Sequence, residues 1–264
     1  EVRFIFGGDL LRQGIATSMG VEALQIPMFG LYGACSTSGE ALALASMSVA
    51  AGYGEYMLAV TSSHFGSAEK EFRFPLGYAN QRPLSAHWTV TGSGAFLVGT
   101  QKSHIRISGV TVGKIVDYGL KDSQNMGACM APAACDTIVQ NLNDFSRKPE
   151  DYDRIITGDL GCVGQDILFD LVKQKGYDIR TKHMDCGMAI FDQKTQDTHA
   201  GGSGCGCAAV TLAAPVLLAF NAVNNLFGVG SSSMMSRALG RKDYDTVSRS
   251  SAFGFYCALF AGIL

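Results

Sequence analysis

The stretch Tyr32-Gly33-Ala34-Cys35-Ser36-Thr37-Ser38-Gly39 places a cysteine at the start of a predicted helix. The residues that follow, 40–51, are apolar on almost every side, which is typical of a buried helix. The backbone N–H groups of a first helical turn favour negative charge, so they stabilise a thiolate or hold a bound anion. Cys35 is therefore a candidate nucleophile, and the alternative is that its position holds an anionic ligand.

The composition excludes several classes of protein. The chain has 264 residues, enough for one large or two ordinary domains. A net charge of -2, without a basic stripe, argues against a nucleic-acid partner. The eight cysteines lie mostly in apolar or glycine-rich surroundings and lack zinc-like spacing, so we expect free thiols, no metal site and no cofactor.

Apolar runs that alternate with helical patterns predict an α/β fold with largely parallel sheets. The polar segment 61–92 has few helix or strand signals, and a loop of this length is typical of a functional site. The expected strands are 2–6, 25–31, 56–60, 94–98, 104–112 and 154–157, and the expected helices are 38–51, 130–145 and 166–175.

One short pattern occurs twice. Residues 5–10, Ile-Phe-Gly-Gly-Asp-Leu, recur at 155–160 as Ile-Ile-Thr-Gly-Asp-Leu. A glycine-rich turn with a cysteine follows each copy, at 33–38 and at 201–205. The repeat suggests that one α/β unit is duplicated, with Asp9 and Asp159 holding backbone turns at the ends of strands.

The chain changes character near residue 213. Two apolar segments lie on either side of a polar loop, 231–251, which contains Arg237, Arg241, Lys242 and Arg249. This arrangement predicts two membrane helices joined on the cytoplasmic side, and a soluble amphipathic hairpin is the alternative.

Several motifs up to residue 210 resemble the stage V sporulation protein AD family of the thiolase-like superfamily. They include GACSTSGEAL (33–42), TVTGSGAF (89–96), ITGDLGCVG (156–164) and GGSGCGCAAV (201–210), and they follow the order of the family. The resemblance implies a thiolase-like duplicated α/β sandwich, truncated at both ends, which forms an incomplete domain over residues 1–212.

Residues 213–264 resemble a different family, the multidrug and toxin extrusion (MATE) transporters. The resemblance is carried by Pro215-Val216, by Asn221-Ala222-Val223-Asn224, and above all by residues 236–243, SRALGRKD. It implies a membrane-embedded fragment, made of a helix, a cytoplasmic loop and the start of the next helix, without independent function. We interpret the chain as a chimeric join of two partial coding sequences.

The first resemblance implies a non-catalytic protein that binds dipicolinic acid (pyridine-2,6-dicarboxylate), with calcium, for its uptake into the developing spore. It would act at the cytoplasmic face of the forespore inner membrane with other proteins of that uptake system, and as a homodimer. One alternative is a cysteine-dependent acyltransferase or condensing enzyme, in which Cys35 accepts the acyl group. No recognisable catalytic histidine motif accompanies Cys35, although the chain contains His64, His87 and His199. A drug/sodium or drug/proton antiporter fragment is the other alternative.

A planar dianion needs hydrogen-bond donors and positive charge at both carboxylates. The segment 61–92 supplies His64, Lys70, Arg73 and Arg82, and Asp185 can reach a calcium ion carried with the ligand. Structural roles are the alternatives: His64 caps a loop, Arg73 lies on a solvated face, and Asp185 holds a backbone turn. The predicted ligand-binding residues are Cys35, Ser36, His64, Arg73, Asp185, Gly202 and Ser203.

Overall fold

The computed structural model describes residues 1–72, 82–103 and 105–209, which belong to one compact unit, Glu1–Thr211. The expected domain boundary near residue 213, the transporter-like segment 213–264 and Arg73 lie outside the described residues. Within the described residues, no helix is both long and apolar enough to cross a membrane.

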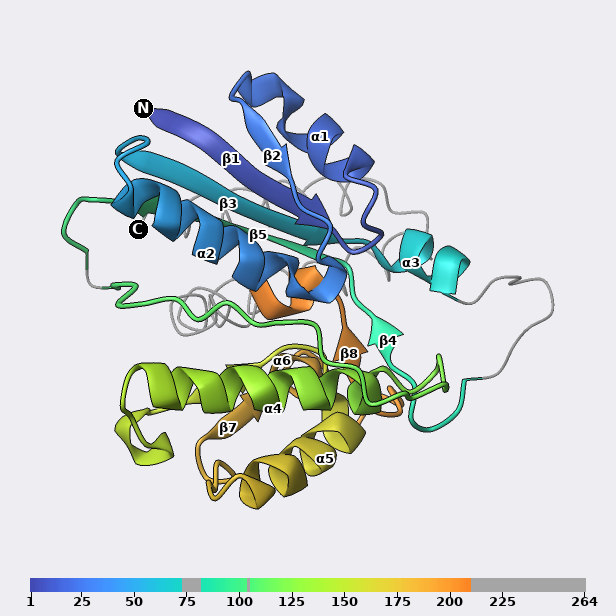
Figure 1. The fold of residues 1–264 in the computed structure, drawn as a ribbon. Coiled ribbons are helices and arrows are strands. Elements are labelled where there is room, and N and C mark those ends of the chain that lie inside the picture. The colour runs from blue at the N-terminus through green and yellow to red at the C-terminus, as the bar shows by residue number, and fades with distance from the viewer. Residues whose placement is uncertain (73–81, 104, 210–264) are drawn as a thin grey trace, which may run out of the picture. The chain divides into compact units, whose positions relative to one another are not determined.

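The larger sheet has the strand order β2-β1-β3-β5. Its strands are β1 (Val2–Asp9), β2 (Met28–Gly30), β3 (Tyr56–Ser63) and β5 (Gly92–Gly99). The central strand β1 is parallel to β2 and β3, whereas β5 runs antiparallel to β3 at the edge (Figure 1). The prediction of a largely parallel sheet is confirmed.

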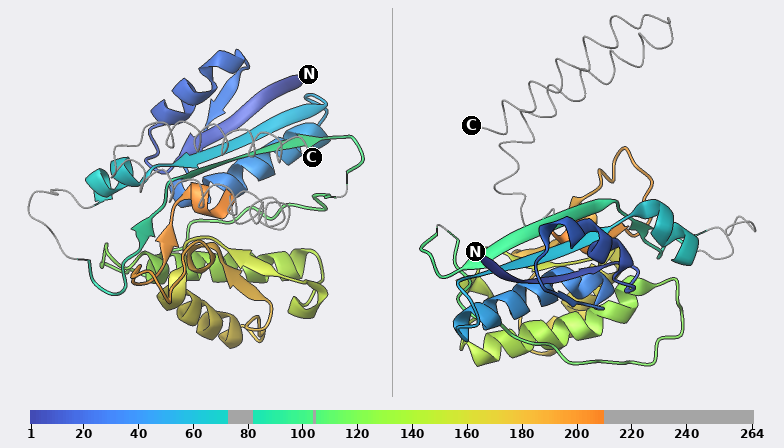
Figure 2. Two further views of the ribbon diagram at one scale, coloured as in Figure 1. Left: turned by 180° about the vertical axis from the view of Figure 1, so that it is seen from behind. Right: turned by 90° about the horizontal axis from the view of Figure 1, so that it is seen from above.

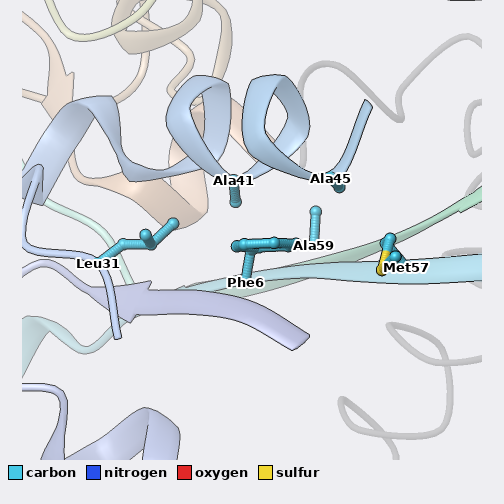
Figure 3. Close-up of a cluster of buried hydrophobic side chains, with 6 residues drawn as sticks. All are labelled: Phe6, Leu31, Ala41, Ala45, Met57 and Ala59. Carbon is cyan, nitrogen blue, oxygen red and sulfur yellow. The ribbon is translucent and has the colours of Figure 1, made fainter. Parts of the chain in front are cut away.

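Two helices cover opposite faces of this sheet. Helix α2 (Thr37–Ala50) packs Ala41 and Ala45 onto Phe6, and these residues form one buried cluster with Leu31, Met57 and Ala59 (Figure 3). Helix α1 (Ile15–Val21) lies on the other face, because a Cβ atom at Gly7 would meet the Thr17 side chain at 3.0 Å. Successive residues of a strand point to opposite faces, which fits Phe6 beneath α2 and Gly7 beneath α1.

Helix α2 is only half-buried, so the expectation of a helix buried on every side is wrong. Its buried residues are Thr37, Ser38, Ala41 and Ala45, whereas Met47 is 50% exposed. The physical reason is that one face packs on the sheet while the small residues of the opposite face stay partly accessible.

The second half of the described chain repeats the parallel strand and helix pattern. Strands β6 (Ile155–Thr157) and β7 (His183–Asp185) pair in parallel beside helices α4 (Met126–Asp144) and α5 (Gly161–Gln174). The two helices approach closely at Gly127, where an added Cβ atom would lie 2.3 Å from the backbone oxygen of Leu160. The core of this half contains Ala131, Cys135, Leu160, Leu168, Val172 and Ile179.

Short elements join the two halves. Strand β4 (Trp88–Thr89) pairs in parallel with β8 (Gly202–Ser203), so segments far apart in the sequence lie side by side (Figure 2). The remaining elements are helices α3 (Phe65–Phe72) and α6 (Cys186–Ala189) and the 3-10 helices Glu22–Leu24, Ala34–Ser36 and Pro149–Asp151.

Two predictions from the sequence are wrong here. The segment 61–92 is not a plain loop, because it contains the end of β3, helix α3 and strand β4. The expected strand 104–112 is absent from its described residues, 105–112. Ile105 is 73% exposed there, and no described strand pairs with this segment, so its alternating apolar pattern has no sheet to join.

Candidate functional site

Cys35 lies in the 3-10 helix Ala34–Ser36, which links β2 to the start of α2 at Thr37. Ala34 has a φ of 51°, a left-handed conformation that turns the chain sharply before the cysteine. The partly buried Cys35 side chain packs against a cluster formed by Leu10, Ala68 and Cys205. The thiol therefore faces the interior.

Ser203 is one hydrogen-bond partner of Cys35. Its Oγ atom lies 3.8 Å from the Cys35 Sγ atom, and its side chain is fully buried on β8. The next residue, Gly204, donates its backbone N–H to Oδ2 of Asp159 at 2.7 Å. Ser203 thus contacts the Cys35 thiol from the first half of the unit, and Gly204 contacts the Asp159 carboxyl group from the second half.

Electrostatics disfavour a thiolate in this position. Burial raises the pKa of Cys35 well above its ordinary value, the neighbouring Asp159 raises it further, and the Ser203 hydroxyl opposes them. Burial also raises the pKa of Asp159, to about 7, against the opposing hydrogen bond from Gly204. The helix start favours a thiolate, but here burial and Asp159 oppose it, because the thiol lies in the interior and not in solvent.

Asp159 is the residue of this site that the sequence prediction missed. It has no exposed surface, its φ is 61°, and its Oδ1 atom makes no hydrogen bond with the described residues. The repeated Gly-Asp-Leu pattern marked it only as a turn residue. Its proximity to Cys35 depends on the packing of the two halves, which the local pattern does not contain.

Asp185 serves as a structural acceptor. Its carboxylate accepts the backbone N–H groups of Leu160 at 3.0 Å and Gly161 at 2.9 Å, together with the Thr157 hydroxyl at 2.7 Å. The N–H of Met188 donates to it at 3.3 Å and so begins α6. These contacts match the alternative of a held backbone turn, and a role of Asp185 in ligand binding stays a prediction.

The other predicted ligand residues are dispersed. Exposed His64 precedes α3 and accepts the N–H of Ser67 on Nδ1 at 3.4 Å, which matches its capping alternative. Exposed Ser36 donates its hydroxyl to the Gly33 carbonyl at 2.9 Å. Gly202 is buried beside Ser203 on β8. The structure thus brings Cys35 together with the Gly202–Ser203 strand, without a hydrogen bond from His64.

Arg82 does not supply a free positive charge. Its guanidinium forms a buried ion pair with Glu69 and lies 4.3 Å from the centre of the Trp88 ring. Glu69 also accepts the Thr89 hydroxyl at 3.0 Å. The arginine therefore fixes the segment before β4.

Within the described part of the chain, no histidine is hydrogen-bonded to the Cys35 thiol. His87 is buried, and burial lowers its pKa. Among the same residues, no group of three or more histidine, cysteine or acidic side chains is arranged to hold a metal ion.

Solved structures share the fold. OleA of Xanthomonas campestris, bound with cerulenin, is 15% identical to this chain, with a TM-score of 0.58. The match covers 83% of this chain and 65% of OleA, which is slightly under two thirds of that protein. A tetronic acid condensing enzyme is 13% identical with a TM-score of 0.52, over 80% of this chain and 68% of that one. At such identities the likeness shows a thiolase-like α/β fold and nothing about activity.

Sequence comparison identifies the family. The family model for stage V sporulation protein AD matches residues 1–247. The stage V sporulation protein AD of Bacillus subtilis (strain 168) is 42% identical over 238 residues, which are 89% of this chain and 70% of that protein. The family match extends beyond residue 213, and no comparison supports a transporter fragment there. The chain therefore belongs to the stage V sporulation protein AD family.

Proposed function

We propose that this chain is a non-catalytic, ligand-binding protein of sporulation, and that its ligand is dipicolinic acid. The observation that carries the non-catalytic part is the state of Cys35. Its thiol is turned inward beside Asp159, and burial raises its pKa. A cysteine nucleophile is usually activated by the reverse change, a lowered pKa.

The same site offers groups for a small dicarboxylate. The Ser203 hydroxyl and the N–H groups at the start of α2 are hydrogen-bond donors for carboxylate oxygens. Burial raises the pKa of Asp159 to about 7, so part of the population is protonated near neutral pH. The protonated carboxyl group can donate a hydrogen bond to another carboxylate oxygen of the ligand. The ligand would thus meet donors from both halves of the unit.

Calcium carried with the ligand would need an oxygen that no hydrogen bond already occupies. Both carboxylate oxygens of Asp185 accept hydrogen bonds, which makes that residue a poor choice. In this site Asp159 acts as a protonated donor, so it does not serve as the calcium ligand either. Calcium would therefore be held mainly by the carboxylate oxygens of the ligand itself and by water.

The cellular setting of the proposal rests on the sequence resemblance. The protein would act at the cytoplasmic face of the forespore inner membrane, as a homodimer, with other proteins of the dipicolinate uptake system.

We propose no transport activity for residues 213–264, because the family match reaches residue 247. Amplification of source DNA across codons 205–220 tests the join: a continuous product excludes an assembly artefact, and a failed product with intact flanks supports one.

Titration calorimetry of the full chain tests ligand binding. We expect saturable binding of dipicolinate, stronger with calcium, and at least tenfold weaker binding of pyridine-2-carboxylate, which lacks one carboxylate. Cys35→Ala, a smaller side chain at the same position, should change the dipicolinate affinity. A folded wild-type chain that gives no binding heat with millimolar dipicolinate, with or without calcium, would refute the proposal.

The competing function is acyl transfer, in which Cys35 would accept the acyl group. An acyltransferase incubated with acyl-CoA gains a covalent acyl mass on Cys35. We expect no such mass on the wild-type chain, and its appearance at Cys35 would replace our proposal with the enzymatic one.

A further inference from the structure

We propose that the cavity beside strand β4 is a second binding site, and that it takes an aromatic ring carrying a protonated amino group. The cavity has a volume of about 430 Å³, within the range of roughly 300–1,000 Å³ that is typical of small-molecule sites. Its walls are formed by the start of α3, by residues 88–91 in and after β4, and by residues 190–191 and 196–198 of the loop that follows α6.

The cavity lies on the face of β8 opposite Cys35. The Ser203 hydroxyl points toward the Cys35 thiol. A Cβ atom at the preceding Gly202 would instead lie 2.5 Å from the Ile190 side chain and 3.0 Å from the Phe191 ring, both of which line the cavity. Successive residues of a strand point to opposite faces, so β8 separates this cavity from the site of the proposed function.

Aromatic side chains from three parts of the chain line the cavity. The rings of Phe65 and Trp88 are nearly parallel, at 4°, with their centres 6.1 Å apart, and Phe191 contributes a third ring. Backbone contacts hold the first two in place: the N–H of Phe65 donates to the Thr91 hydroxyl at 2.9 Å, and the N–H of Trp88 donates to the Gly201 carbonyl at 2.9 Å. Aromatic faces stack on a planar ring and attract a cation, because their electrostatic potential is negative.

The charge at the cavity favours an amine over an acid. Of the described residues that line it, Asp197 alone is charged, and its side chain is 86% exposed beside His199. Arg82 lies against the Trp88 ring, but the buried ion pair with Glu69 offsets its charge. A carboxylate next to aromatic faces attracts an ammonium group and repels a second carboxylate.

The loop wall of the cavity is braced by its own hydrogen bonds. The Asp192 carboxylate accepts the N–H of Lys194 at 3.0 Å and the Thr195 hydroxyl at 2.8 Å. The Gln196 side chain in turn accepts the N–H of Asp192 at 2.9 Å. A wall that is formed before the ligand arrives loses little conformational freedom on binding, which favours affinity.

The fluorescence of Trp88 tests the proposal directly, because Trp88 is the only tryptophan of the full chain. The probe is 2-phenylethylamine, with excitation at a wavelength that its phenyl ring does not absorb. We expect a saturable change in the Trp88 emission. Two matched probes should bind at least about threefold more weakly: 3-phenylpropionate, which carries a carboxylate in place of the amine, and 2-cyclohexylethylamine, which lacks the aromatic ring.

Two pairs of variants locate the bound amine. Asp197→Asn should weaken the binding of 2-phenylethylamine about threefold, as expected for an exposed ion pair, whereas Asp170→Asn, an exposed acid of α5 outside the cavity, should not. Phe191→Leu should also weaken it, and Phe145→Leu, which changes a half-buried ring outside the cavity, should not. If Phe191→Leu does not fold, Phe65→Leu takes its place, since the Phe65 ring is partly exposed.

A folded chain whose Trp88 emission does not respond to 2-phenylethylamine overturns the proposal. Equal affinities for the amine and for 3-phenylpropionate do the same, as do equal losses in Asp197→Asn and Asp170→Asn. Competition between dipicolinate and the amine would overturn the separation of the two sites. Calorimetric titration with dipicolinate alone reports on the proposed function, so the failure of one proposal is distinguishable from the failure of the other.

Discussion

The Sγ atom of Cys35 and the Oγ atom of Ser203 lie 3.8 Å apart, although 168 positions separate the two residues in the sequence. Each belongs to one of the two glycine-rich turns of the repeat. The site is therefore formed where the two halves of the unit meet, and neither half contains it alone. A substitution in either half can therefore alter the position of the residues that form the site.

Ser203→Ala should weaken dipicolinate binding about fivefold, because it removes one hydrogen-bond donor at a cost of about 1 kcal/mol. It should also slow the alkylation of Cys35 by iodoacetamide, since the Ser203 hydroxyl lowers the pKa of this thiol. Titration calorimetry and peptide mass spectrometry measure the two effects. Ser46→Ala is the control, because the Ser46 hydroxyl donates to the Leu42 carbonyl within α2. Equal affinities of Ser203→Ala and wild type would remove Ser203 from the binding site.

The stability of the fold should depend on pH through Asp159. Burial raises its pKa to about 7 in the folded chain, above the value of about 3.9 for an unfolded aspartate. Between these values the folded state binds more protons, so the contribution of Asp159 to the free energy of unfolding falls as the pH rises from about 4 to 7. Asp159→Asn should therefore be more stable than wild type at pH 8, by an amount on the order of a few kcal/mol, and should lose this advantage near pH 4.

Urea unfolding of both proteins at pH 5 and pH 8 measures this difference. Burial lowers the pKa values of His87 and His183, which makes stability rise with pH over part of the same range. Both histidines are present in wild type and variant, so their effect cancels in the comparison. A difference between the two proteins that is the same at both pH values would contradict the prediction.

Asp185→Ala should destabilise the fold by about 3 kcal/mol or more, because it leaves the buried N–H groups of Leu160 and Gly161 without an acceptor. Thermal unfolding measures the loss. A residue that mainly contacted the ligand would give the opposite pattern, an unchanged melting temperature with weakened dipicolinate binding. The pair of measurements therefore decides between the two roles of Asp185.

Glu69→Gln should cost about 3–5 kcal/mol, because it leaves the buried guanidinium of Arg82 without its counter-charge. Burial lowers the pKa of Arg82 only to about 10, so the group stays charged at neutral pH. Asp170→Asn is the control, since it breaks the exposed pair with Arg180 and should cost less than about 1 kcal/mol. Similar unfolding midpoints for the two variants would show that the Glu69 pair is not a buried charge pair in solution.

Gly127→Ala should destabilise the fold by about 3 kcal/mol, because the new Cβ atom would meet backbone atoms of Leu160 and Gly164 at 2.3 Å and 2.9 Å. Gly39→Ala is the matched change at an exposed position of α2, where nothing lies within 4 Å of the new atom. It should stabilise the helix by up to about 1 kcal/mol. Chemical denaturation of both variants checks the opposite signs, and a neutral Gly127→Ala would contradict the close contact of α4 and α5.

Patterns along the sequence predicted much of the fold. The strands around residues 2–6, 56–60 and 94–98 were recognisable because apolar, β-branched and aromatic residues gather there. Segment 105–112 shows the limit of this signal, since its alternating residues Ile105 and Ile107 remain exposed without a neighbouring strand. A strand pattern describes one chain segment, whereas a strand needs a partner.

The candidate site was predicted less completely. Cys35 and Ser203 were selected from glycine-rich turns, and the structure brings them together. The sequence leaves Cys35 open as a nucleophile or as the seat of an anion, because the influence of a helix start is local, whereas burial and Asp159, which raise the pKa of the thiol, depend on tertiary packing. Likewise, the sequence does not reveal that Arg82 is paired with Glu69, because this ion pair depends on tertiary packing.

The left-handed backbone of Asp159 also limits what mutation can place there. With a φ of 61°, the position accepts glycine, asparagine and aspartate with little strain and disfavours other side chains. An aspartate codon becomes an asparagine codon by a single base change. Single base changes at this codon therefore fit the existing turn only where they yield asparagine or glycine, so the backbone itself narrows the range of residues that this position accepts.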